Sequence, residues 1–386
     1  MIDNSLHAKK IAIFTEAKIG YGGGEKIIVS IHDYLNEQNL GSIIAENQNF
    51  EYKNEDSEKI ASLLDKDLID LKFKRYGFPK FLYQDFPPIC YLLSNDYLVS
   101  LILLRRVPPP KILKTIYLSH AKIIFCLHGI ALEKIRITNP LILLHQVITR
   151  IKLKQLSQYT NDHIFIQTLL PAVSNKLLKY GANKKNIFTI GNDVPSNTFN
   201  IRKNDNIFNV VFVSRIDNLQ KGIDLLRKVI YKTYKLDNRI KFNIIGSGKD
   251  VKKLNNLPEN AKFYNYVSEN EKAKIIEMSN LAIITSNLEP FSLVALELLS
   301  AGLPLVTTPT SGPSYIISKD VAFGIISSFN PSDISNSIYN YFQIWNTDKN
   351  KYFRLRKEIT NKYYETFSNN MLNSYFEMIS RVMSEK

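Results

Sequence analysis

Residues 209–234, NVVFVSRIDNLQKGIDLLRKVIYKTY, contain the pattern that decides the fold. An apolar run at 209–214 is typical of a strand, and a polar loop leads from it into an amphipathic helix that begins near residue 222. The same alternation recurs on both sides of this stretch. Strands that alternate with helices predict parallel sheets of βαβ units, so we expect an α/β protein.

The alternation predicts a series of further elements. Strands are expected at 10–15, 122–127, 163–167, 187–190, 241–245, 281–285 and 304–308. Helices are expected at 25–38, 141–158, 172–180, 249–256, 270–279 and 291–301. Within the first of these helices, the spacing places four apolar side chains on one face: Ile27, Ile28, Ile31 and Leu35.

The chain has 386 residues, which is too long for one ordinary core, so we expect two domains. The polar, breaker-rich segment 195–207 precedes a fresh strand and marks the boundary. We assign 1–198 to an N-terminal domain and 199–365 to a C-terminal one, facing each other across a cleft. A helix-forming tail at about 366–386 is expected to pack back onto the first domain.

Composition favours a globular protein of a reducing compartment. The chain is 45% hydrophobic and 22% charged, and neither of its two cysteines has a nearby metal-type partner. The apolar piece near the N-terminus is too short for a signal-peptide core. The longest apolar runs, at 97–104 and 141–144, are too short to span a bilayer. We therefore expect a cytoplasmic protein that at most contacts the inner face of a membrane.

The net charge of +14 is unevenly distributed. Residues 1–100 carry a net −4, residues 101–200 a net +11, and the remainder a net +7. The basic middle could meet nucleic acid, anionic lipid or an anionic substrate. Its apolar runs at 101–114 and 141–156 favour an anionic membrane surface, and a simply solvated basic face is an equal alternative. Because the chain has no nucleic-acid-binding module, we expect no nucleic-acid partner.

Three loops between strands and helices carry residues suited to ligands, each with a structural alternative. Arg215 and Lys221 lie at one strand end, where two fixed cations suit a diphosphate, although they could be ordinary surface charges. Glycines at 22–24 precede a helix and would admit a phosphate or sugar, or form a flexible turn. The turn at Gly246 and Gly248 is explained as readily by structure alone.

The fourth loop, SNLEPFSLVALELLSAGLP at 286–304, holds two glutamates in different settings. Glu297 falls among apolar residues of the expected helix, where an unpaired carboxylate is costly to bury. A carboxylate accepts two hydroxyl hydrogen bonds well, so a ribose diol is a natural partner. Glu289 lies in the preceding loop, and the amides near Phe291–Leu293 would face an anion.

The segment EPFSLVALE, residues 289–297, resembles the E-x7-E motif of retaining GT-B glycosyltransferases of family 4, the glycosyl transferases group 1. Further segments resemble this family in the same order along most of the chain: GYGGGEKIIVSIHDYL at 20–35, VSNKLLKYGANKKNIFTIGNDVPSNTF at 173–199, FVSRIDNLQKGIDLL at 212–226, IIGSGKDVKKL at 244–254 and AGLPLVTTPTSGPSYII at 301–317. The resemblance implies a GT-B fold of two Rossmann-like, doubly wound parallel-sheet domains.

The resemblance also implies roles for individual residues. The catalytic set would be Glu289 at the donor sugar, Arg215 and Lys221 at the diphosphate, and His128 beside the sugar. The donor-binding set would be Glu297 at the ribose, Phe291, Ser292, Leu293, Gly23, Gly24 and Gly246. Two departures leave the identity of the sugar open: E-P-F-S replaces the usual E-G-F-G, and Tyr315 stands where many members carry Glu.

The expected activity is therefore transfer of a hexose-type sugar, with retention, from a nucleotide-sugar to a hydroxyl of a glycan or lipid-linked acceptor. The basic and apolar stretches point to a lipid carrier and, with the resemblance, to bacterial surface polysaccharide such as O-antigen, lipopolysaccharide or capsule. No D-x-D follows a strand, so we expect no metal and no cofactor. The alternative is an inactive adaptor of the same fold that binds a partner or glycan without turnover.

Overall fold

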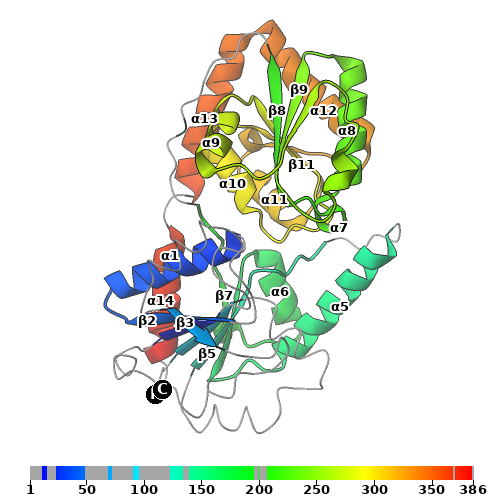
Figure 1. Cartoon of the computed structure of the whole chain (residues 1–386). Helices are drawn as coiled ribbons and strands as arrows, with labels where there is room; N and C mark the ends of the chain where they lie inside the picture. The colour runs from blue at the N-terminus through cyan, green and yellow to red at the C-terminus, as the bar shows by residue number, and fades with distance from the viewer. Residues whose placement is uncertain are drawn as a thin grey trace. The chain divides into compact units, whose positions relative to one another are not determined.

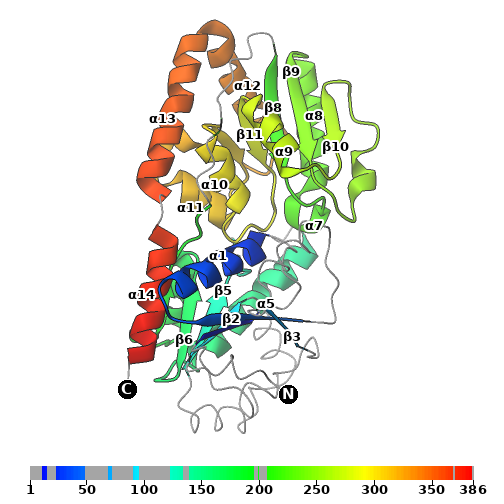
Figure 2. The same cartoon turned by 60° about the vertical axis from the view of Figure 1, so that its left-hand side comes forward.

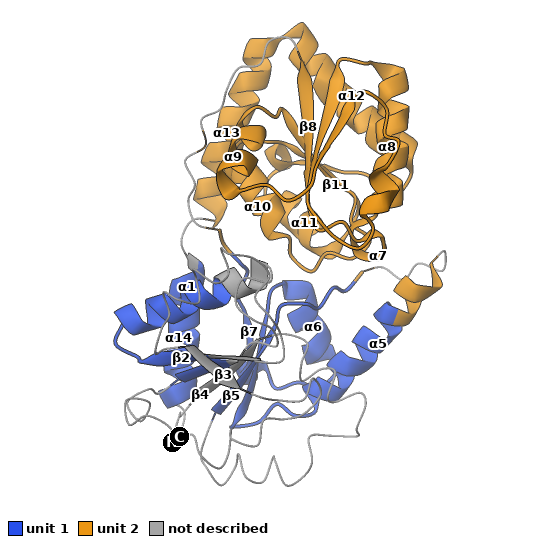
Figure 3. Ribbon diagram, in the orientation of Figure 1, with its two compact units in different colours: residues 1–132, 145–192, 369–386 blue, residues 133–144, 193–368 orange. Residues whose placement is uncertain are grey.

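A computed structural model describes residues 11–14, 23–47, 68–71, 90–94, 122–133, 139–194, 199, 207–367 and 370–384. The chain forms two compact units (Figure 3). Unit 1 comprises Met1–Leu132, His145–Asn192 and Asn369–Lys386, and unit 2 comprises Glu133–Leu144 and Asp193–Ser368. Unit 2 thus takes the short segment 133–144, which the sequence pattern assigned to the N-terminal domain.

Unit 1 is built on a seven-stranded, all-parallel sheet of order β3-β2-β1-β4-β5-β6-β7. Its strands are β1 (Ile11–Phe14), β2 (Ser42–Asn47), β3 (Leu68–Leu71), β4 (Cys90–Ser94), β5 (Lys122–Leu127), β6 (Ile164–Thr168) and β7 (Ile187–Thr189). Every side chain of β5 and β6 is buried, as expected for a parallel strand covered on both faces.

Helices of unit 1 cover both faces of this sheet (Figure 1). They are α1 (Gly23–Glu37), α5 (Pro140–Ser157), whose first turn belongs to unit 2, α6 (Pro171–Lys179) and α14 (Asn370–Ser384). The four residues predicted to form the apolar face of α1 are all buried, which confirms the helical spacing predicted for them. Helix α14 lies beside α1 (Figure 2), where Tyr34 donates a hydrogen bond to Asn373 at 2.9 Å.

Unit 2 is built on a second all-parallel sheet, of order β10-β9-β8-β11-β12-β13. Its strands are β8 (Phe208–Val213), β9 (Ile240–Ile245), β10 (Ala261–Tyr264), β11 (Leu281–Ile284), β12 (Leu305–Thr307) and β13 (Gly324–Ile326). The order reverses between β8 and β11, and in open sheets of this kind ligands bind beside the strand ends at that switch point.

Helices enclose this sheet as well. They are α7 (Asn218–Lys221), α8 (Ile223–Leu236), α9 (Glu269–Glu277), α10 (Leu293–Ser300), α11 (Ser311–Ile317), α12 (Pro331–Thr347) and α13 (Lys349–Phe367). Figure 1 shows α8 and α12 on one face of the sheet, and α9, α10 and α13 on the other. Phe208 of β8 anchors the core, with its ring 5.5 to 5.9 Å from the rings of Phe342, Trp345 and Tyr352.

A buried arginine fixes the end of helix α10. Arg356 of α13 is fully buried and donates from Nε to the carbonyl of Gly302 and from a terminal nitrogen to that of Ala301, each at 3.1 Å. These carbonyls lie at the C-terminus of α10, where backbone acceptors have no partner within the helix. Burial lowers the pKa of Arg356 to about 10. Through Arg356, helix α13 therefore fixes the C-terminal end of α10, the helix that carries Glu297.

The sequence pattern located β1, β5, β6 and β7 of the first sheet and β8, β9, β11 and β12 of the second, and it missed β2, β3, β4, β10 and β13. Strands β10 and β13 lie at the edges of their sheet and are half-exposed, so they lack the apolar run that marks a central strand. The helix expected at 249–256 is a single turn of 3-10 helix, Val251–Leu254. Within the described part of the chain, no helix is both long enough and apolar enough to cross a membrane.

Candidate functional site

Candidate residues of unit 2 gather beside the ends of β8 and β11, at the switch point of the sheet. Arg215 and Lys221 lie in the loop and short helix after β8, and Glu289 lies in the loop after β11. The chain brings them together because parallel strands end at the same edge of a sheet.

The segment after β8 has a defined shape that sets the position of Lys221. The carboxylate of Asp217 accepts from the amide of Gln220 at 3.2 Å and so caps α7. Gly222 then adopts φ +66°, and a Cβ there would lie 2.1 Å from the carbonyl oxygen of Thr285. Only glycine fits this approach, so α7 ends at Lys221 and directs it toward the next loop.

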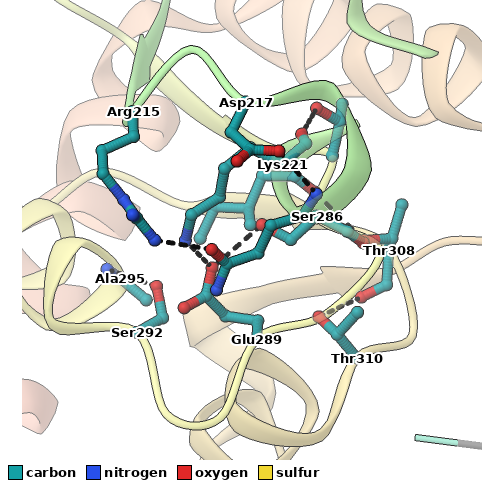
Figure 4. Close-up of polar contacts among 12 residues, drawn as sticks. Arg215, Asp217, Lys221, Ser286, Glu289, Ser292, Ala295, Thr308 and Thr310 are labelled. Atoms are coloured by element: carbon teal, nitrogen blue, oxygen red, sulfur yellow. Dashed lines mark hydrogen bonds and ion pairs between the residues drawn. The ribbon is translucent and has the colours of Figure 1, made fainter. Parts of the chain in front are cut away.

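A short ion pair joins the two loops (Figure 4). Lys221 Nζ lies 2.5 Å from Glu289 Oε2, and only 13% and 9% of the two side chains is exposed. The hydroxyl of Ser286 donates to the same carboxylate oxygen at 2.9 Å. Both bonds go to Oε2, which leaves Oε1 as the oxygen that can meet a ligand.

Arg215 adds a second cation at the same place. Its side chain is exposed and donates to the amide oxygen of Gln220 at 2.5 Å, and Figure 4 shows it directed toward the Lys221–Glu289 pair. Two cations of different exposure thus lie at the same strand end: a partly buried lysine held by a carboxylate and an exposed guanidinium. Such a pair suits a ligand with two negative charges, such as a diphosphate.

Helix α10 begins with a strained residue. Ser292 is its N-cap at φ +82°, a left-handed conformation that glycine adopts readily and serine rarely does. Its hydroxyl accepts from the amide of Ala295 at 3.2 Å, which offsets part of the strain. The amides of Leu293 and Val294 have no acceptor within the helix because they belong to its first turn. The amide of Leu293 is one of those near Phe291–Leu293 that were predicted to face an anion.

Two aromatic residues pack together beside this turn. Phe291 is buried, and its ring lies 6.4 Å from that of Tyr315 in α11. Tyr315, the residue noted as a departure from the family, thus packs against the predicted donor loop. Lys319 Nζ lies over the Tyr315 ring, 4.4 Å from its centroid.

Glu297 is paired, contrary to the expectation of an unpartnered carboxylate in an apolar setting. Its Oε1 lies 2.7 Å from Lys272 Nζ of α9, and 15% of its side chain is exposed. Burial by itself would lower the pKa of Lys272, but the charges and hydrogen bonds of Glu297 and Glu269 outweigh it, and the pKa is raised. Lys272 is therefore charged at neutral pH, beside a carboxylate that keeps access to solvent.

The glycine positions have structural explanations. Gly246 has φ +145°, and a Cβ on it would lie 1.7 Å from the carbonyl oxygen of Ser214, so the loops after β8 and β9 can touch only if it is glycine. Gly23 and Gly24 lie inside the first turn of α1, which begins two residues before the expected start. Residues 15–22 lie outside the described part of the chain. Donor binding by these three glycines stays a prediction.

His128 follows β5 in unit 1, where its Nε2 lies 2.9 Å from the hydroxyl of Tyr375 in α14. Burial lowers the pKa of His128 to about 4, which outweighs the opposite effect of a hydrogen bond with Gln167. The imidazole is therefore neutral at pH 7 and cannot serve there as a proton donor of ordinary strength. Its role beside a donor sugar stays a prediction.

Sequence reasoning missed three polar partners of the predicted residues: Ser286, Lys272 and Glu133. Glu133 is buried, and it accepts hydrogen bonds from the backbone amides of Glu289 and Ser311. The sequence did contain one indication of Glu133, because it is one of only three acidic residues in the basic segment 101–200. Among the described residues, no three His, Cys, Asp or Glu side chains gather closely enough to hold a metal ion.

The domain that holds this site matches the model of a known protein family. Residues 193–358 match the family model "Glycosyl transferases group 1". An uncharacterized glycosyltransferase of Methanocaldococcus jannaschii, MJ1607, is 27% identical over 182 residues, which cover 45% of this chain and 46% of that protein. The chain thus aligns with less than half the length of this curated relative.

Solved structures match nearly the whole chain. Anabaena HepE in complex with UDP and glucose superposes with a TM-score of 0.69 at 14% identity, covering 97% of this chain and 100% of that one. WaaG, a glycosyltransferase involved in lipopolysaccharide biosynthesis, gives a TM-score of 0.63 at 11% identity, covering 96% and 99%. At these identities the likeness shows the fold, so the chain has the two parallel α/β sheets of the GT-B fold.

The left-handed conformation of Ser292 predicts that the free energy of unfolding rises in Ser292→Gly and falls in Ser292→Ala. Ser292→Gly loses the cap, at a cost of a few tenths of a kcal/mol, but relieves about 1 kcal/mol of left-handed strain. Ser292→Ala loses the cap and keeps the strain, and should destabilise unit 2 by about 1 kcal/mol. Urea unfolding gives the order. Ser268 caps α9 at φ −63°, so Ser268→Gly is the matched control and should only destabilise. An alanine variant as stable as the wild type would contradict this account.

The buried imidazole of His128 predicts acid sensitivity of unit 1. Because its folded-state pKa of about 4 lies below the unfolded value, its contribution is complete above pH 6.5 and is lost as the pH falls toward 4. The loss is up to about 3 kcal/mol. Denaturant unfolding of the wild type and of His128→Gln, which does not titrate, should show a steeper decline for the wild type over this range. If the unfolding free energies of the two proteins changed in parallel with pH, the lowered pKa of His128 would be refuted.

Proposed function

Starting from the glycosyl transferases group 1 domain that the chain contains at residues 193–358, we propose that the protein is a retaining glycosyltransferase of family 4. It moves a sugar, of hexose type, from a nucleotide-diphosphate-sugar to a hydroxyl of a glycan or lipid-linked acceptor. The observation that carries the proposal is the contact of Lys221 with Glu289, beside Arg215 and the first turn of α10.

The geometry suits a diphosphate leaving group. When the bond between the anomeric carbon and the phosphate oxygen breaks, its electron pair goes to the diphosphate. Arg215, Lys221 and the amides of Leu293 and Val294 offset the charge that develops there. The acceptor oxygen forms the new bond to the anomeric carbon, and its proton passes to the diphosphate. No step in this scheme needs a metal ion.

Glu289 would act on the sugar rather than on the phosphate. Its Oε2 is held by Lys221 and Ser286, which orients the carboxylate, while Oε1 is left for a sugar hydroxyl or for the positive charge that develops on the ring. When the diphosphate binds, Lys221 can contact both the phosphate and Glu289, since an ammonium has three donors.

Glu297 would hold the ribose of the donor. Its carboxylate shares Lys272 with Glu269 and remains partly exposed, so hydroxyl groups can reach it. The solved complex of HepE with UDP and glucose supports a nucleotide-sugar as the donor class.

The acceptor is inferred from helix α5 and from the similar proteins. Four apolar side chains of α5 are exposed, by 61, 55, 41 and 46%: Leu141, Leu144, Val147 and Ile151. Their spacing places them on one face of the helix, with Arg150 and Lys154 on one side and Lys152 on the other, and α5 has no acidic residue. This arrangement is typical of a helix that lies in an anionic membrane interface.

A membrane face of this kind favours a lipid-linked acceptor and a peripheral position on the inner face of the cytoplasmic membrane. The structural likeness to WaaG, a lipopolysaccharide enzyme, supports bacterial surface polysaccharide as the setting. We propose this setting as the working hypothesis for the acceptor.

Turnover tests the activity. The protein is incubated with a panel of nucleotide-sugars, with and without lipid-linked acceptors and a chelator, and release of nucleoside diphosphate is measured. With the donor that reacts, Lys221→Met and Arg215→Ala should each lower kcat by about 100-fold, because each removes a charge that stabilises the leaving group. Lys232→Met, an exposed lysine about two and a half turns along α8, is the control and should be unchanged.

The outcomes separate the candidate functions. A Lys221→Met variant with undiminished turnover would remove that residue from the mechanism. Binding of a nucleotide-sugar without turnover in the presence of every acceptor would favour the adaptor instead. The anomeric configuration of the product, read by NMR, decides between retention and inversion.

Vesicle binding tests the membrane face. The protein should co-sediment with vesicles that contain about 30% phosphatidylglycerol, and less so at high salt because the charges are screened. The double variant Leu144→Glu, Val147→Glu should bind at least about tenfold more weakly, since it places two carboxylates in the interface. Leu236→Glu, at an exposed leucine that ends α8, is the control. Equal binding of the double variant and the wild type would exclude α5 as the contact.

A further inference from the structure

Glu133 is a buried carboxylate that the proposed mechanism does not use. It is 3% exposed, it lies in the segment 133–144 of unit 2, and its two oxygens face backbone amides. Oε1 accepts from the amide of Glu289 at 3.2 Å and from that of Ser311 at 3.1 Å, and Oε2 accepts from Ser311 at 2.9 Å. A buried carboxylate is stable only with such donors, so these bonds are the reason it can lie there.

The two amides belong to the loops that follow adjacent strands. Glu289 lies in the loop after β11, and Ser311 opens α11 directly after the loop that follows β12. Thr310, the N-cap of α11, makes no side-chain cap bond, so Glu133 supplies the acceptor that a capping side chain would otherwise provide. One carboxylate from position 133 therefore ties the start of α11 to the loop of Glu289.

The same two loops meet at a second point. The amide of Gly312 donates to the carbonyl of Glu289 at 2.9 Å, and a Cβ on Gly312 would lie 2.3 Å from the carbonyl oxygen of Phe291. Glu289 is thus held at its backbone N–H by Glu133 and at its backbone C=O by Gly312. Its carboxylate is held in turn by Lys221 and Ser286.

We propose that Glu133 is a positioning residue for Glu289. It does not contact the donor; it sets where the backbone of Glu289 lies, and hence where Oε1 meets the sugar. This inference rests on the proposed function, in which Glu289 acts at the sugar. Displacement of a reacting group by about 1 Å can cost about 100-fold in rate, so the fixing of one amide has a large expected effect.

Substitution by glutamine is the informative change. Glu133→Gln keeps the size of the side chain but replaces one acceptor oxygen with an NH2 group, which cannot accept from an amide. Both oxygens accept from Ser311, so in either orientation the NH2 group opposes that amide, and where it replaces Oε1 the amide of Glu289 also loses its acceptor. Asp162→Asn is the matched control: Asp162 is another of the three acids in 101–200, it is exposed, and the same acid-to-amide change is made there.

The experiment combines three measurements on the full chain. Hydrogen exchange of peptides that cover 286–292 and 309–313 should become faster in Glu133→Gln and stay unchanged in Asp162→Asn. Calorimetric binding of UDP alone should stay within about twofold, because the ribose site proposed at Glu297 lies in α10, outside the two loops that Glu133 bonds. Turnover with the donor identified in the panel should fall by about 100-fold in kcat, with KM within about threefold. Glu133→Asp, which keeps both oxygens, should recover part of kcat.

A purely structural cap would give a different result. In that case Glu133→Gln would unfold at a lower temperature with kcat unchanged at a temperature where it is folded, and the proposal would be overturned. If the wild type turns over no donor at all, the proposed function fails separately. Hydrogen exchange then decides the positioning of Glu289: unchanged exchange at 286–292 in Glu133→Gln overturns it, and faster exchange supports it.

Discussion

The site of unit 2 depends on one ion pair, between Lys221 and Glu289, that joins the loops after two neighbouring strands. The two residues are 68 positions apart in the chain, and the sheet brings their loops together at one edge. Isolated charges at this depth would be unfavourable, and their pairing, with the hydroxyl of Ser286, offsets the desolvation. Removal of either partner would leave the other buried without a counter-charge.

Backbone contacts around the pair make this arrangement rigid. The amide of Asn287 donates to the carbonyl of Gln220 at 2.8 Å, and its side chain donates to the carbonyls of Asn218 and Leu219. Thr285 donates to the carbonyl of Lys221 at 3.0 Å. The two loops therefore form one unit before any ligand arrives. A preorganised site of this kind does not need to reorganise when charge develops on a leaving group.

The sequence was sufficient to place these residues but not to pair them. Arg215, Lys221 and Glu289 could be assigned to one edge of a sheet because each follows an apolar run that reads as a parallel strand. The partner of Glu297 could not be found in this way. Lys272 lies on the neighbouring helix α9, and its register against α10 depends on packing that no local pattern encodes. Glu133 is a similar case, since its partners are backbone amides, which every residue has. Long-range polar contacts are thus the part of the site that only the folded chain reveals.

The assignment of α14 to unit 1 has a consequence for the order in which the chain can fold during synthesis. Residues 193–368 are continuous and can fold as soon as they leave the ribosome. Unit 1 cannot, because Asn373 and Tyr375, which bond to Tyr34 and His128, emerge only after all of unit 2 has been made. Of the two units, the one that begins earlier in the chain is therefore completed later. Until α14 arrives, the side of α1 that packs against it, including the ring of Tyr34 that contacts Phe376, stays uncovered.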